Sequence, residues 1–255
     1  MSRLRTAVKP KGPVTVLGAG LAGSEAAWQL ASRGIPVRLV DMKPYQMTPA
    51  HEAEGFAELV CSNSLKSDRL QNASGLLKEE MRRLGSLVIQ AADQSRVPAG
   101  GALAVDRAAF SGFITERLKA HPLVEVQSCL ADSLPEAPAI IATGPLTAGG
   151  LDEEIAALAG TLHFFDAAAP IVTRDSIDMG IAFRQSRYGR GDDYINCPLS
   201  QTEYHAFIDA LLSAKAAPVH GFEEGLLFEG CMPIESMARR GRMAPAFGPM
   251  KPVGL

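Results

Sequence analysis

The fold is decided by the stretch VTVLGAGLAG, residues 14–23. Its first four residues form a short, β-branched and apolar run that predicts a buried strand. The next six have the spacing Gly-x-Gly-x-x-Gly, and residues 24–33 suit a helix because of their alanines and leucine. Residues 35–40 predict a second strand, which ends at Asp41. Strand, glycine loop, helix, strand and acid in this order predict a βαβ unit that binds a dinucleotide.

Each glycine of this loop has a physical task. Gly18 permits the tight turn, Gly20 lets the backbone approach a pyrophosphate, and Gly23 lets the helix pack closely on the strand. The helix N-terminus offers unpaired N–H groups to the anion, and Asp41 is expected to accept from a ribose hydroxyl. The alternative is a glycine-rich connection in an ordinary α/β domain. The residues predicted to bind the cofactor are Gly18, Ala19, Gly20, Leu21, Ala22, Gly23 and Asp41.

The residues after the second strand indicate which nucleotide is bound. A nicotinamide-binding domain would continue with regular βα units, whereas here a loop containing proline and histidine runs from Met42 to His51. Residues 139–145 (AIIATGP) predict a buried strand that ends in Thr143-Gly144, as in flavoproteins with two dinucleotide-binding sites. This pattern favours FAD over NAD.

Further elements are predicted from periodicity and capping. Residues 76–89 have helical periodicity, and their charged residues are interpreted as a solvated face. Asp106 is expected to cap another helix, and residues 124–126 predict a strand. A further helix is expected over residues 201–212.

Composition limits the class of protein. The chain has 255 residues, 47% of them hydrophobic, which is ample for a packed core. It contains no apolar run of roughly 18 residues and no apolar signal region, so we expect a cytoplasmic protein without a membrane segment. The net charge of −3 gives no overall attraction to nucleic acid, although a local basic patch can still bind phosphates. The four cysteines and five histidines show no metal-ligand spacing, so no metal is predicted.

Three longer segments resemble signature segments of the TrmFO family, the flavin- and folate-dependent tRNA uracil-5-methyltransferases. They read FAELVCSNSLKSD at residues 56–68, FEGCMPIE at 228–235 and FGPMKPVGL at 247–255. Together with the glycine loop, they follow the family's order over nearly all of residues 13–255. The related MnmG/GidA flavoproteins, which modify the wobble uridine, lack the two cysteine-containing segments in this form.

The resemblance implies a fold and an activity. The fold is α/β: an FAD-binding, Rossmann-like domain of the two-dinucleotide type at residues 1–150, with an inserted α+β substrate domain at 151–230. Residues 231–255 would begin the return to the FAD domain, and because family members continue further, the fold is expected to be incomplete at the C-terminus.

The implied activity is methylation of a T-loop uridine in tRNA. The methylene carbon would come from 5,10-methylenetetrahydrofolate, the reducing equivalents from reduced FAD, and NADH or NADPH would reload the flavin. A flavin oxidoreductase without a nucleic-acid substrate, or an inactive fragment of the methyltransferase, are the alternatives.

The chemistry requires a reactive cysteine. C5 of uracil is a poor nucleophile, and addition of a thiolate to C6 activates it. Cys61 lies in a polar segment with Lys66 nearby, a setting that lowers a thiol pKa, whereas two glutamates flank Cys231 and raise it. The local residues therefore favour Cys61, yet the resemblance implies catalytic roles for both Cys61 and Cys231, and which of them meets uracil stays open. Cys129 and Cys197 match no segment and are predicted to be packing residues.

Two groups of arginines are candidates for contact with tRNA phosphates. The group beside Cys231 is the stronger candidate, and a solvated surface is the alternative for each. The first group is Arg184, Arg187 and Arg190 around Tyr188, and the second is Arg239, Arg240 and Arg242.

Overall fold

The computed structural model describes residues 12–60, 62–160, 172–186, 189, 191–215, 232–247 and 250. The chain divides into two compact units, the first comprising residues 1–97 and 103–162 and the second residues 98–102 and 163–255. The predicted domain boundaries at residues 150 and 230 stay predictions.

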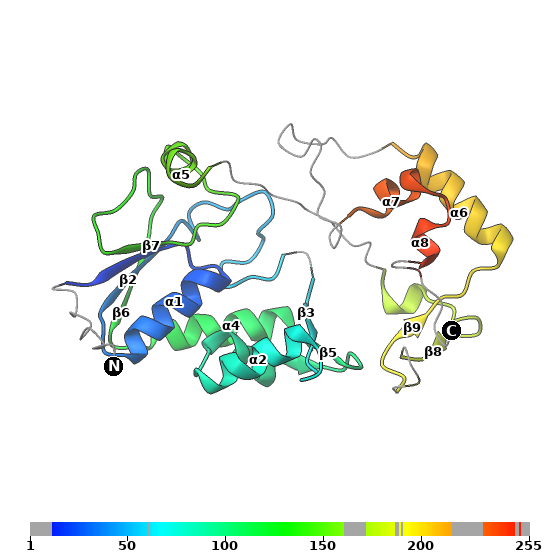
Figure 1. Ribbon diagram of the computed structural model, residues 1–255, viewed down its shortest axis with the longest axis horizontal. Helices are drawn as coiled ribbons and strands as arrows, with labels where there is room; N and C mark the ends of the chain where they lie inside the picture. Colours follow the sequence, from blue (N-terminus) through cyan, green and yellow to red (C-terminus); the bar gives the residue numbers. More distant parts are fainter. Residues whose placement is uncertain are drawn as a thin grey trace, which may run out of the picture. The chain divides into compact units, whose positions relative to one another are not determined.

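A four-stranded parallel sheet forms the centre of the first unit (Figure 1). Its order is β6-β2-β1-β7, so the chain leaves β1 on one side and returns to it on the other. Helix α1 (Leu21–Ser32) connects β1 to β2. This arrangement confirms the predicted βαβ unit. The strands are β1 (Val14–Leu17), β2 (Val37–Asp41), β6 (Val124–Ser128) and β7 (Ala139–Ile141).

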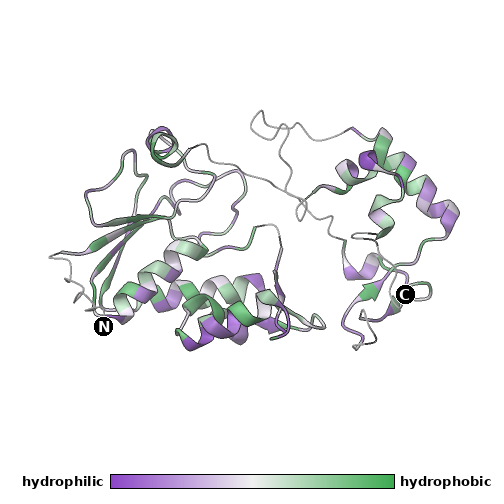
Figure 2. Ribbon diagram, viewed as in Figure 1, coloured by the Kyte–Doolittle hydropathy of each residue, from purple (hydrophilic) through white to green (hydrophobic). Residues whose placement is uncertain are grey.

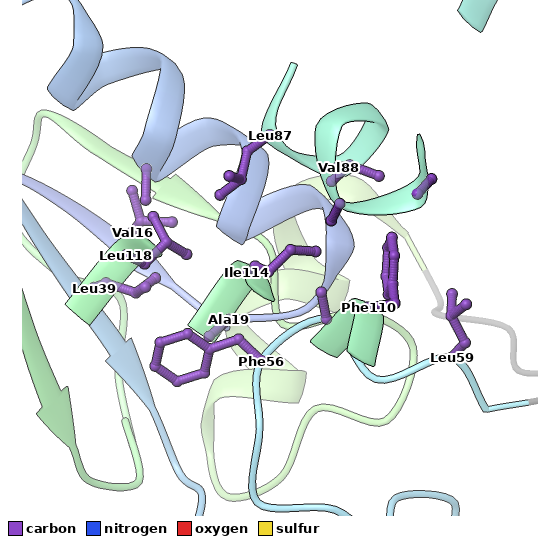
Figure 3. Packing of buried hydrophobic residues seen from close by; sticks show 14 of the residues in the cluster. Val16, Ala19, Leu39, Phe56, Leu59, Leu87, Val88, Phe110, Ile114 and Leu118 are labelled. Atoms are coloured by element: carbon purple, nitrogen blue, oxygen red, sulfur yellow. The ribbon is translucent and has the colours of Figure 1, made fainter. Parts of the chain in front are cut away.

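Three helices contribute to one hydrophobic core with this sheet (Figure 3). They are α1, α3 (Leu87–Gln94) and α4 (Arg107–Lys119). Phe110, Ile114 and Leu118 recur every fourth residue on α4 and are fully buried, as expected for the inner face of a helix. Burying each such side chain stabilises the fold by about 1.5–3 kcal/mol. Asp106 caps α4, because its Oδ1 accepts the N–H of Ala109 at 2.8 Å, as predicted.

The prediction of one helix over residues 76–89 is wrong. The structure has two helices here, α2 (Ala73–Arg83) and α3. The chain breaks at Gly85, whose φ of 72° is left-handed, and the Ser86 hydroxyl then accepts the N–H of Ile89 at 3.2 Å to begin α3. Local apolar periodicity continues through this break, and the glycine was the sequence signal for it.

The charged face predicted on this helix is only partly solvated. Arg82 donates to Asp93 and to Asp68, both at 2.8–2.9 Å, so it links α2 to α3 and to the segment after β3 (Ser64–Ser67). Lys78 is buried and donates to the carbonyls of Ser67 and Ser74 at 2.9 Å. Helix α2 therefore has a buried polar side.

Strand β3 belongs to a small sheet of order β3-β5-β4, with β4 (Arg96–Val97) and β5 (Ala102–Val105). Helix α5 (Leu151–Ala159) ends the described part of this unit.

The second unit contains a two-stranded antiparallel sheet and a small helical cluster. Helix α6 (Gln201–Ser213) confirms the predicted helix and begins with a capping box between Ser200 and Glu203. It has hydrophobic and hydrophilic residues (Figure 2), and Tyr204 and Ile208 pack with Ala238. The other elements are a 3-10 turn (Arg174–Ser176), β8 (Phe183–Arg184), β9 (Ile195–Asn196), α7 (Ile234–Arg240) and α8 (Ala244–Phe247).

Candidate dinucleotide-binding site

The glycine loop joins the carboxyl end of β1 to the N-terminus of α1. Gly18 has a φ of 90°, and a Cβ on it would lie 2.5 Å from the carbonyl oxygen of Ala142, just after β7. A Cβ on Gly23 would lie 1.8 Å from the carbonyl oxygen of Gly18. A Cβ on Gly20, in contrast, would meet nothing within 4 Å. Two glycines are therefore required for internal packing, and Gly20 leaves space on the outside of the loop for a ligand.

The N-terminus of α1 is open to an anion. No side chain caps it, and its first turn contains no acidic residue. Leu21 and Ala22 are exposed, whereas Gly23 is buried against the loop. The first N–H groups of a helix have no carbonyl partner within the helix and have a partial positive charge, which favours a phosphate at this place. The strand order also reverses at β1, with β2 on one side and β7 on the other, and folds of this kind bind nucleotides beyond the carboxyl ends of the strands at such a point.

Asp41 organises the loop from the end of β2. Its Oδ2 accepts the backbone N–H of Ala19 at 2.6 Å, and its Oδ1 accepts the N–H of Lys43 at 2.9 Å. A carboxylate oxygen has two lone pairs, so each oxygen can still accept a ribose hydroxyl. The hydrogen bond to the glycine loop was not foreseen from the sequence.

Both backbone polar groups of Ala19 are hydrogen-bonded within the protein. Its N–H donates to Asp41, and its carbonyl accepts both the N–H of Ala57 at 2.8 Å and the hydroxyl of Ser24 at 3.0 Å. Ala19 itself is 1% exposed. The segment that leads to position 61 is thus attached directly to the glycine loop, although no sequence pattern links residues 19 and 57.

The buried side chain of Lys43 holds the segment between Asp41 and Ala57, the two residues that bind the backbone of Ala19. Lys43 is 8% exposed, and its Nζ donates to the carbonyls of Ala53 and Gly55 and lies 3.8 Å from a carboxylate oxygen of Glu58. Burial, with a further contribution from the Lys43 charge, lowers the pKa of His51 below its usual value. His51 is therefore held mainly as the neutral ring at pH 7.

The two predicted catalytic cysteines, Cys61 and Cys231, lie outside the described residues. Cys129 and Cys197 are exposed, so the prediction that they are packing residues is wrong. Cys129 follows the last residue of β6, where its N–H donates to the carbonyl of Asp41 at 3.0 Å and its side chain is free to face outward. Cys197 follows the short strand β9. The preference of cysteine for burial was outweighed here by position at the end of a strand.

The second group of arginines lies on the second unit. Arg239 and Arg240 end α7, and Arg242 follows it; all three are exposed. Arg242 forms an ion pair with Asp209 of α6, and the hydroxyl of Tyr204 donates to the Arg242 carbonyl at 2.7 Å. In the first group, Arg184 is exposed on β8, and the predicted contacts of Arg187, Tyr188 and Arg190 fall outside the described residues.

Two other features, a membrane-spanning helix and a metal site, are not found in the described part of the chain. Within it, no helix has both the length and the apolar character needed to cross a membrane. The same residues contain no group of three or more histidine, cysteine, aspartate or glutamate side chains placed to hold a metal ion.

Comparison with known proteins gives the family. The family model described as "Glucose inhibited division protein A", or GidA, matches residues 13–255. The chain belongs to the GidA family. The glycine loop lies close to the start of the matched region.

Within this family, the chain is similar in sequence to proteins named methylenetetrahydrofolate--tRNA-(uracil-5-)-methyltransferase TrmFO. It is 59% identical to that of Staphylococcus carnosus over 95% of this chain and 56% of the relative. It is 60% identical to that of Anaeromyxobacter sp. over 95% of this chain and 55% of the relative. The resemblance to TrmFO is confirmed, and the chain spans about half the length of these relatives.

The Aquifex aeolicus GidA structure is 17% identical, with a TM-score of 0.36, over 45% of this chain and 19% of that chain.

Proposed function

We propose that this chain provides the FAD-binding loop and the reactive cysteines of a folate- and flavin-dependent tRNA uracil-5-methyltransferase. The observation that carries the proposal is the uncapped α1 N-terminus behind an open Gly20, in a chain 56–60% identical to proteins of that name. The cytoplasm is the expected location, because that is where a tRNA substrate is found.

The residues present fit a dinucleotide. The backbone N–H groups at residues 20–22 would hold the diphosphate, and the free lone pairs of Asp41 would accept from the ribose. When bound, FAD in its reduced form would supply the hydride that converts a methylene group to a methyl group. The exposed side chains of Leu21 and Ala22 would border the diphosphate without adding charge, so its binding depends on the backbone.

The cysteines would supply the covalent step. A thiolate at Cys61 or Cys231 adds to C6 of uracil, and C5 then gains the electron density needed to attack the methylene carbon of methylenetetrahydrofolate. Removal of the C5 proton by a base would expel tetrahydrofolate and leave an exocyclic methylene group on C5. Addition of a hydride, which reduced FAD would supply, would convert that group to methyl as the thiolate leaves C6 and the ring is restored. The Lys66 cation and the polar residues that follow Cys61 would favour the thiolate there.

The exposed Arg239 and Arg240 are proposed to contact tRNA phosphates. Each phosphate contact that is lost reduces the slope of log affinity against log salt by about 0.7–0.9. The double substitution Arg239→Gln and Arg240→Gln should therefore lower this slope by about 1.5 for the complete protein. An unchanged slope would remove these arginines from the interface.

We also propose that NADH or NADPH supplies the electrons that reduce the flavin.

The deciding experiment follows label from methylenetetrahydrofolate into unmodified tRNA, using the complete protein with FAD. Cys61→Ala and Cys231→Ala should each abolish labelling while flavin stays bound, and Cys129→Ala is the matched control that should label normally. Full labelling by either of the first two variants would exclude that cysteine. Oxidation of NADH or NADPH without label in tRNA, from the unsubstituted protein, would instead support a plain flavin oxidoreductase.

A further inference from the structure

The ring of Phe247 lies on the surface of the second unit. This residue is 77% exposed, more than any other large hydrophobic residue in the described part of the unit. The residues before it on α8 face the opposite way, because Pro245 is buried and Ala246 packs against the buried cluster of α6 and α7. A single exposed apolar side chain is common on protein surfaces, so its neighbours decide what it can bind.

The backbone that carries this ring is fixed by packing and hydrogen bonds. The hydroxyl of Tyr204 on α6 donates to the carbonyl of Arg242 at 2.7 Å, which holds the turn between α7 and α8. After α8, the N–H of Met250 donates to the carbonyl of Pro245 at 2.9 Å, and the Met250 side chain packs against the cluster that contains Tyr204. The chain is thus anchored on both sides of Phe247.

Exposed cations lie close to this ring in the chain. Arg239 and Arg240 end α7, within eight residues of Phe247, and both are exposed. Among the described residues neither has an acidic partner, whereas Arg242 is paired with Asp209. Helix α7 contacts both α6 and α8 (Figure 1). Two packed helices therefore present two guanidinium groups and one aromatic ring to the solvent.

An unpaired nucleotide combines the two chemistries that this surface offers. Its phosphate accepts hydrogen bonds from a guanidinium group, and the flat face of its base stacks on an aromatic ring. A paired duplex presents the same phosphates but keeps its bases stacked inside the helix, so an exposed phenylalanine adds nothing to its binding. The surface therefore fits a loop or single-stranded stretch of RNA.

We propose that Phe247 is a stacking platform for an unpaired base of the RNA partner, with Arg239 and Arg240 on the neighbouring phosphates. The identity of that RNA as tRNA rests on the proposed function. Stacking on Phe247 itself requires only an unpaired base, so it can be measured without methyl transfer.

The first test measures the affinity of the 255-residue chain for a single-stranded oligouridylate of about 12 nucleotides and for a blunt RNA duplex of the same length. Phe247→Leu keeps an apolar side chain and removes the ring. It should weaken binding of the single strand by about 5-fold to 100-fold and leave the affinity for the duplex unchanged. The slope of log affinity against log salt should stay at its native value, because the ring carries no charge.

Two variants control this measurement. Phe247→Trp keeps an aromatic ring and should bind the single strand at least as tightly as the native chain does. Tyr45 is an aromatic residue of the first unit that is 82% exposed, so Tyr45→Ala removes a ring of similar exposure and should bind RNA normally.

Phe247→Trp also gives a spectroscopic readout. The native chain contains one tryptophan, Trp28, which donates to the carbonyl of Gly85 at 3.0 Å and packs edge-on against His121 in the first unit. Single-stranded RNA should quench the fluorescence added by the substitution and leave the emission of the native chain unchanged. A ring that only supports the fold would not respond to RNA in this way.

Native affinity of Phe247→Leu for the single strand, an equal loss of affinity for the duplex, or fluorescence at position 247 that RNA leaves unchanged would each overturn the proposal. A native chain that binds neither RNA would also overturn it. If the stacking is observed while the complete native protein transfers no label to tRNA, the platform stands and the proposed function fails. If label reaches tRNA and Phe247→Leu binds the single strand normally, only the platform fails.

Discussion

The substitution Gly23→Ala should destabilise the first unit through a contact that the structure defines. The new Cβ would lie 1.8 Å from the carbonyl oxygen and 2.9 Å from the carbonyl carbon of Gly18. Both are backbone atoms of a loop that is hydrogen-bonded to β2, so relief requires α1 to move away from β1. Overpacking of this kind costs about 3 kcal/mol at the upper end of its usual range, and alanine regains about 1 kcal/mol of helix propensity. We therefore expect a net loss of about 2 kcal/mol.

The assay is urea unfolding, with thermal unfolding as a second measurement. A loss of this size lowers Tm by about 4–8 °C in a protein of this length. Gly20→Ala is the matched control, because its Cβ would meet nothing within 4 Å and its φ of −67° is open to alanine. It should leave stability nearly unchanged and weaken FAD binding instead. Equal stability of the two variants would refute the argument that Gly23 is needed for packing.

Three further predictions concern stability. Asp106→Ala removes the cap of α4 and should cost about 1 kcal/mol in urea unfolding, with Asp106→Asn costing less; equal losses would contradict the capping role. Lys43→Met leaves the carbonyls of Ala53 and Gly55 without their donor and should cost about 2 kcal/mol or more, so native stability in this variant would show that the buried amine is dispensable. For His51, the folded pKa is lower than the value of 6.5 expected in the unfolded chain, so its contribution is present above pH 6.5 and is lost as the pH falls through the folded pKa. Urea unfolding from about pH 7.5 to 5 should show this loss, and His51→Asn should make that part of the profile flatter.

The βαβ unit could be predicted because its signals are local. A β-branched run, three glycines and an alanine-rich helix each lie within a few residues, and Asp106 indicates the start of α4 in the same way. The break between α2 and α3 was missed because apolar periodicity crosses Gly85 without interruption. The inward position of Lys78 was missed for a different reason: its partners are the carbonyls of Ser67 and Ser74, and sequence patterns do not show where backbone carbonyls point.

Only those parts of the candidate site whose residues lie close together in the sequence were predictable. The glycine loop and Asp41 follow from spacing, whereas the bond between Ala57 and Ala19 joins residues far apart in the chain. Two side-chain hydroxyls of α4 hydrogen-bond to the backbone of Phe56 and lie 55 and 59 positions away from it, on a helix whose inner face shows in sequence only as apolar periodicity. Contacts of this kind depend on how helices pack, and a single sequence does not record that packing. The roles of Cys61 and Cys231 stay predictions.

The central claim is that a diphosphate binds at the N-terminus of α1. Site-resolved amide exchange of the chain with and without FAD tests it most directly. We predict that FAD slows exchange at residues 20–23 and that Gly20→Ala abolishes this effect while the chain stays folded. Bound FAD that leaves these amides unprotected, or a folded chain that binds no FAD at millimolar concentration, would contradict the account.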